Sequence, residues 1–163
     1  MPTPLLIIGV QSLLSFIAFG LIARWYLVPW LSKFSLEDRL AALIWLHVFC
    51  YVALTGLLPG QVSADVPAFA LNAVVYGDTI SALLALVSVI LLRARTPGAI
   101  AMAWVFNVVG LLDWAQSQVV GVSAQAFAYP AGASALVYAF YVPLLVVTHV
   151  MMIYWLFSHR RSA

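Results

Sequence analysis

The stretch AFALNAVVYGDTISALLALVSVILL, residues 68–92, is followed at once by Arg93-Ala94-Arg95. A helix that crosses a bilayer needs about 20 mostly apolar residues, and this stretch exceeds that length. Two arginines directly after an apolar helix are typical of a cytoplasmic boundary, because cytoplasmic loops collect Lys and Arg. The stretch therefore predicts a transmembrane helix whose C-terminal end faces the cytoplasm.

Four similar stretches complete the pattern. Apolar runs at about residues 5–28, 40–58, 99–120 and 134–157 have the length and composition of spanning helices. All seven basic residues fall on one side of the resulting five-helix pattern: Arg24, Lys33, Arg39, Arg93, Arg95, Arg160 and Arg161. The sequence predicts an all-α, polytopic transmembrane bundle of five helices, with the N-terminus outside and the C-terminus cytoplasmic.

Composition supports this class and bounds the partners. The chain is 66% hydrophobic and 7% charged, whereas a soluble domain carries about 25% charged residues. Residues 1–163 suffice for a single bundle and leave no room for a second domain. The one cysteine, Cys50, excludes an intrachain disulfide and any CxxC motif. No basic run is dense enough for nucleic acid, so we expect the lipid bilayer as partner, with a homo-oligomer or a larger membrane complex as open alternatives.

Basic residue usage points to the source of the chain. Only one of the seven basic residues is Lys, and Ala is abundant. This bias is typical of a GC-rich bacterial genome. The expected location is therefore a bacterial inner membrane, where the chain is a multi-pass protein.

Ionisable residues inside spanning helices are the candidate functional residues, because each costs about 2.5 to 3.5 kcal/mol near the bilayer centre on insertion scales. A rise of about 1.5 Å per residue places them at two depths. His47, Asn107 and His149 form an expected inner layer. The expected outer layer lies nearer the other side and contains Asp78, Asp113, Thr55, Tyr138 and Tyr141.

Helical spacing suggests which faces these residues share. On the second helix, His47, Tyr51 and Thr55 recur every four residues and are expected on one face. On the fifth helix, His149 shares a stripe with Tyr141, and Pro143 is expected to kink the helix between the two layers. Most of these stripes are expected to face the bundle interior and not lipid.

Each layer allows several chemistries. Two neutral histidines on facing helices could clamp a b-type haem, bind another transition metal or relay protons. They could equally be structural, for instance through a hydrogen bond from His149 to Asn107. If Asp78 and Asp113 are close, they share one proton, and such a pair could bind a cation, carry a proton or hold an amine. Each aspartate could also simply accept a hydrogen bond from a neighbour.

Four segments carry a resemblance to a known family. They are Leu46-His47-Val48-Phe49, Tyr76-Gly77-Asp78, Trp104-Val105-Phe106-Asn107 with Asp113 following, and Val142-Pro143-Leu144-Leu145 leading to Thr148-His149. These strings are similar to segments in a family of small, uncharacterised bacterial membrane proteins of about five helices. The resemblance covers the second to fifth helices. It implies a membrane location and the helix count, and it adds no activity and no catalytic residue.

Three functions are therefore open. The first is a membrane protein that binds or conducts a small ligand, ion or proton through a polar pocket lined by Asp78, Asp113, Asn107, Tyr141 and Thr55 together with the histidines. The second is a redox protein that holds haem b through His47 and His149. The third is a non-catalytic membrane subunit or scaffold. No P-loop, dinucleotide fingerprint or HExxH motif points to a known enzyme class.

Overall fold

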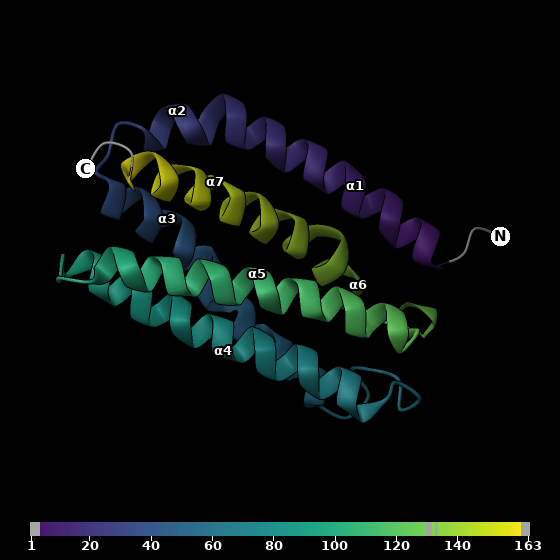
Figure 1. Ribbon diagram of the computed structural model, residues 1–163. Coiled ribbons are helices and arrows are strands. Elements are labelled where there is room, and N and C mark those ends of the chain that lie inside the picture. Colours follow the sequence, from purple (N-terminus) through teal and green to yellow (C-terminus); the bar gives the residue numbers. More distant parts are fainter. Residues whose placement is uncertain (1–3, 130–131, 133, 161–163) are drawn as a thin grey trace.

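The computed structural model describes residues 4–129, 132 and 134–160, and within them every regular element is a helix. Five helical rods run alongside one another (Figure 1). Each rod is long and apolar enough to cross a membrane: Leu5–Leu31, Leu36–Leu57, Ala68–Arg93, Ala99–Ser123 and Ser134–His159. The prediction of an all-α chain with five such helices is confirmed.

The rods differ from the expected helices mainly at their ends and in their internal turns. The first comprises α1 (Pro4–Ile22), η1 (Ala23–Leu27) and α2 (Val28–Leu31), and the second comprises α3 (Leu36–Val48) and η2 (Phe49–Leu57). The third and fourth are α4 (Ala68–Arg93) and α5 (Ala99–Ser123). The short η3 (Ala126–Ala128) follows. The fifth rod comprises α6 (Ser134–Leu136), η4 (Val137–Tyr141) and α7 (Val142–Arg160).

Four of the rods form the core of the bundle, and α1 lies outside it. The second rod packs along α4, α4 packs along α5, and α7 contacts both α3 and α5. By contrast, α1 contacts mainly α7 and η4, as Figure 1 shows for its purple ribbon. Five of its large side chains are more than half exposed: Leu5, Leu6, Leu13, Leu14 and Ile17. The first rod therefore covers one side of a four-rod core.

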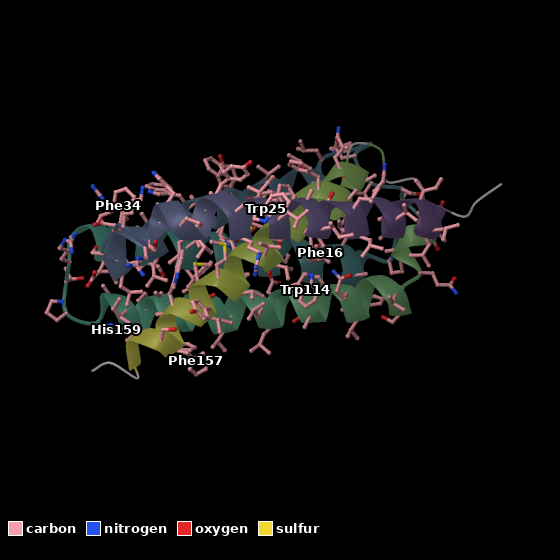
Figure 2. The ribbon with its side chains drawn as sticks, turned by 90° about the horizontal axis from the view of Figure 1, so that it is seen from above. Phe16, Trp25, Phe34, Trp114, Phe157 and His159 are labelled. Carbon is pink, nitrogen blue, oxygen red and sulfur yellow. The ribbon has the colours of Figure 1, made fainter. Side chains whose placement is uncertain are left out.

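Charged side chains gather at one end of the bundle, which we call the basic end. Here the Ser35 hydroxyl accepts from the Asp38 backbone N–H and caps α3. Asp38 forms ion pairs with Arg93 at 3.2 Å and with Arg95 at 2.9 Å, which ties α3 to the turn between α4 and α5. Phe34 lies at this end in Figure 2. Arg161 of the basic pattern lies outside the described residues.

The opposite end, which we call the distal end, carries the segment 58–67 and the described residues between α5 and α6. The start of α1 lies at this end in Figure 1, and the end of α7 lies at the basic end. The two ends therefore differ in charge, because neither 58–67 nor 124–133 contains a Lys or Arg.

A wide π-type turn precedes Pro143 and has a clear physical cause. In η4 the Val142 N–H donates to the Val137 carbonyl, five residues back. The next donor would be residue 143, but proline has no N–H, so the Tyr138 carbonyl loses its helical partner. The Ser12 hydroxyl of α1 donates to that carbonyl at 3.1 Å. A π-type turn therefore lies where a kink was expected, and the carbonyl that it frees provides a hydrogen-bonding point for α1.

The second rod changes its helical period midway. η2 is a 3-10 helix of nine residues, longer than the usual run of 3–4 residues. A 3-10 helix rises about 2.0 Å per residue instead of 1.5 Å, so the 22 residues of this rod span about 38 Å. That length matches the length of the 26-residue α4, and the second rod packs alongside α4. The extension also changes which side chains face the interior.

Candidate functional site

His149 and Asn107 form the centre of the inner layer. His149 Nδ1 and Asn107 Oδ1 are 2.9 Å apart, which joins α7 to α5. The Asn107 amide donates to the Ala103 carbonyl at 3.1 Å, so its oxygen is the atom that faces the histidine. Nδ1 of His149 must then carry the proton that is donated, and Nε2 keeps a lone pair. This contact is the hydrogen bond named above as the structural alternative for His149.

His47 reaches the same layer from the last turn of α3. Its Nε2 lies 2.9 Å from the Thr148 hydroxyl oxygen, and that hydroxyl donates to the Leu145 carbonyl at 2.8 Å. Because the Thr148 proton is already used, His47 Nε2 must be the donor, and Nδ1 keeps a lone pair. His47 is 2% exposed and His149 is 3% exposed. Both imidazoles are therefore buried and oriented by neutral partners.

The two imidazole rings contact each other directly. Their centroids are 4.3 Å apart, and Phe106 lies against both rings, with centroids 5.1 Å from His47 and 5.3 Å from His149. The inner layer predicted from helix depth is thus brought together, and Thr148 and Phe106 complete it.

This geometry does not fit a haem held between the two histidines. An iron ligated on opposite faces by two imidazoles keeps their ring centroids on the order of 6 Å apart, with the porphyrin between them. The observed separation is 4.3 Å, and the rings touch. In addition, no three His, Cys, Asp or Glu side chains within the described ranges are placed to hold one metal ion together. The histidines suit a role as hydrogen-bonding groups.

Asp113 lies on α5 against the backbone of α4. A Cβ added at Gly77 would fall 1.9 Å from Asp113 Oδ1, so only a glycine permits this close approach. The Ser81 hydroxyl donates to Oδ2 at 3.1 Å. Among the described side chains, Oδ1 is the one buried oxygen or nitrogen atom without a hydrogen-bond partner. The hydrogen bond from Ser81 therefore holds the carboxyl group in place, and one of its two oxygens has no hydrogen-bond donor among the described residues.

Asp78 lies beside Gly77 on α4 and faces the same interior. It is close enough to Asp113 for the two carboxyl groups to interact electrostatically. Asp78 forms no hydrogen bond or ion pair with any residue that the structure describes. The outer layer thus contains two carboxyl groups with unused acceptor capacity.

One partly open cavity of about 170 Å³ connects the two layers. Its wall includes both histidines and both aspartates, together with Cys50, Thr55, Ser81 and Tyr138. It reaches the distal end, where Val62 and Tyr129 line it, and Trp114 lies along its side. Figure 2 shows Trp114 well away from Phe34 and His159, which mark the basic end. The two layers, which the sequence places at different depths, therefore line one cavity.

Two of the expected site residues do not line this cavity. Asn107 is fully buried and forms a hydrogen bond with His149, which does line the cavity. The Tyr141 hydroxyl instead donates to the Leu46 carbonyl, at the junction of α3 and η2. Toward the basic end, the last described residues that line the cavity are His47, Ser81, Gly110 and His149. Ile44, Phe106 and Met152 are fully buried and do not line it. The site therefore ends at the histidines.

The expected face with His47, Tyr51 and Thr55 is corrected by the 3-10 period of η2. With three residues per turn, the residues that follow His47 on its face are Cys50, Ala53 and Gly56, and all of them line the cavity. Tyr51 is 48% exposed, and the exposed Thr55 donates its hydroxyl proton to the Val52 carbonyl. Thr55 still touches the cavity, but its donor is used within its own helix.

The residue pattern missed three positions that shape the site. Thr148 was not expected to contact His47, because it lies about 100° around the helix from His149. Gly77 and Gly110 allow Asp113 and His149, respectively, to approach a neighbouring backbone. An isolated glycine within a helical pattern costs about 1 kcal/mol relative to alanine, so it often indicates a packing requirement. That signal was available in the sequence.

Comparisons with known proteins place the chain in a family without assigning an activity. Neither the curated proteins nor the solved structures yielded a significant match. A family model described as a domain of unknown function (DUF8737) matches residues 7–157, which include all four residues of the two histidine and aspartate pairs. The chain therefore belongs to the DUF8737 family.

Proposed function

We propose that this protein is an integral membrane protein that binds a small ligand in the cavity between the two aspartates and the two histidines. The observation that carries the proposal is the cavity itself, because its lining includes the four costliest intramembrane residues of the chain, one from each of four rods. Small-molecule sites are mostly apolar hollows with a few convergent polar groups, and this cavity has that character.

The proposed orientation places the distal end outside a bacterial inner membrane and the basic end in the cytoplasm. Lys33, Arg39, Arg93 and Arg95 all lie at the basic end or in its turns, which agrees with the distribution of basic residues in cytoplasmic loops. Ligand would then enter from the outside and stop at the histidines. Binding fits this closed geometry better than conduction through the bundle.

Lys33 offers a direct test of the orientation, because it is the only lysine in the sequence and is exposed. We expect a membrane-impermeant amine reagent to modify Lys33 only after the cells are opened, as measured by mass spectrometry of the peptide that contains it. Modification in intact cells would show that the basic end faces outward.

Ligand binding can be tested without knowing the natural ligand. The probes are benzylamine, benzyl alcohol, toluene and benzoate, which share one size and differ in polar group. We expect at least one of them to bind the protein in nanodiscs at a ratio of one to one, measured by calorimetry with empty nanodiscs subtracted. Val74→Phe places a bulky ring in the cavity wall and should weaken that binding at least tenfold.

Val87→Phe is the matched control for this substitution. It adds the same ring to the same helix, α4, at a position that is 45% exposed and outside the cavity. Binding should be unchanged in this variant. If none of the four probes binds, the proposed function is wrong, and the polar residues are packing groups of a non-catalytic subunit or scaffold.

A further inference from the structure

The hydrogen-bond donors around the two histidines are already used, which determines what the cavity can offer a ligand. Thr148 donates to Leu145, so His47 donates through Nε2 and presents a lone pair on Nδ1. His149 donates through Nδ1 to Asn107 and presents a lone pair on Nε2. Each imidazole therefore keeps one acceptor nitrogen, and both imidazoles belong to residues that line the cavity.

The two aspartates add further acceptors to the lining of the same cavity. Ser81 donates to Asp113 Oδ2, which can accept a second hydrogen bond, whereas Asp113 Oδ1 is buried against Gly77 and receives none from any described residue. Asp78 accepts no hydrogen bond within the described part of the chain. We call His47, Asp78, Asp113 and His149 the acceptor cluster. A ligand that forms hydrogen bonds with the acceptor cluster must supply the donors. A positive charge on the ligand would also favour binding beside the two carboxyl groups.

We propose that the ligand is a small organic molecule with a primary ammonium group, bound with its N–H groups donating to the acceptor cluster. This inference rests on the proposed function and names the ligand class for the same site. A primary ammonium carries three donors and no acceptor, which is the complement of the cluster. Most of the remaining wall is apolar and includes Val74, Leu145 and Val146, so the rest of the ligand is a hydrocarbon body.

Size and surroundings support an organic cation over a bare ion. The cavity of about 170 Å³ is slightly larger than a 150 Å³ protein cavity that takes up benzene. That volume suits a benzene-sized body with one short polar arm. Trp114 lies on the wall, and an indole face attracts a cation. A metal ion is disfavoured, because the described residues place no three His, Cys, Asp or Glu side chains around one point.

The four probes already named separate this inference from the proposed function. In nanodiscs we expect benzylamine to bind at least tenfold more tightly than benzyl alcohol and toluene. Benzoate should bind weakest, because the aspartate pair keeps one negative charge when it shares a proton, and that charge repels the benzoate carboxylate. If toluene, benzyl alcohol or benzoate binds as tightly as benzylamine, the ammonium inference is wrong while the proposed function stands. If no probe binds, both are wrong.

Charge-removing variants of nearly equal shape test the role of the acceptor cluster. Asp113→Asn and Asp78→Asn should each weaken benzylamine binding at least tenfold, measured on protein that elutes as a single species and keeps its helical circular dichroism. Asp65→Asn is the control, because Asp65 lies in the distal segment, accepts from Ser63 and is outside the cavity. Its benzylamine affinity should stay within twofold of the original. Unchanged affinity in both cluster variants would overturn the inference.

Discussion

Replacing Gly110 by alanine is expected to destabilise the protein by about 1 to 3 kcal/mol, the usual cost of overpacking a tight interior. The added Cβ would fall 2.8 Å from both Cε1 and Nε2 of His149. The imidazole cannot simply move aside, because it is hydrogen-bonded to Asn107 and stacked on Phe106. Displacement of the ring would also break the bond between α5 and α7, and hydrogen bonds between membrane helices average about 0.6 kcal/mol.

The measurement is reversible unfolding in mixed detergent micelles, followed by circular dichroism. Gly20→Ala is the matched control, because Gly20 also lies within a helix and a Cβ there would meet nothing within 4 Å. That variant should be unchanged or up to about 1 kcal/mol more stable, because alanine favours the helix. An equal effect of the two substitutions would show that the contact between Gly110 and His149 does not constrain the bundle.

Gly77→Ala is expected to have the second large effect, and here the site changes more than the global stability. The new Cβ would lie 1.9 Å from Asp113 Oδ1 and 2.9 Å from Cγ, so the carboxyl group must rotate away from α4. Rotation would break the hydrogen bond from Ser81. We expect a loss of about 1 to 2 kcal/mol in unfolding free energy, as for a hydrogen bond to a carboxyl group, and at least tenfold weaker benzylamine binding.

A double-mutant cycle separates the contact from a general effect of alanine in α4. With Asp113→Ala in place, the carboxyl group is gone and Gly77→Ala should cost little. The two substitutions should therefore couple by about 0.5 to 3 kcal/mol, the range seen for residues in contact. Strictly additive free energies would contradict the close approach between Gly77 and Asp113. The binding assay adds an independent readout in the Gly77→Ala single variant.

Helix depth predicted the members of the inner layer because it depends only on sequence position. His47, His149 and Asn107 lie at similar distances from the basic end, and the structure brings them into contact. The same reasoning placed Asp78 and Asp113 together on the outer side, where both line the cavity. Rise per residue is nearly constant in an α-helix, so depth is a robust prediction wherever the helix is regular.

Prediction of helical faces failed where the helix is not an α-helix. Tyr51 and Thr55 share a face with His47 only if the period is 3.6 residues, and η2 has a period of three. The 3-10 period instead brings Cys50 and Gly56 to the cavity wall. In the same way, the π-type turn before Pro143 frees the Tyr138 carbonyl for Ser12. Pro143 marks the second irregularity in the sequence, but the 3-10 period of η2 has no such mark and depends on how the neighbouring rods fit together.

The sequence by itself determined the class of this protein: five apolar helices, a basic end and four costly ionisable residues within the apolar stretches. The hydrophobicity of one segment and the charge of one loop do not depend on how the helices pack, so the spanning helices and the basic end can be identified from the sequence alone. Only the tertiary structure decided that the two polar layers share one cavity, that His47 bonds Thr148, and that the paired imidazoles leave no room for a haem. Those features depend on how the packed helices are rotated and spaced, and that packing is determined jointly by side chains from different rods.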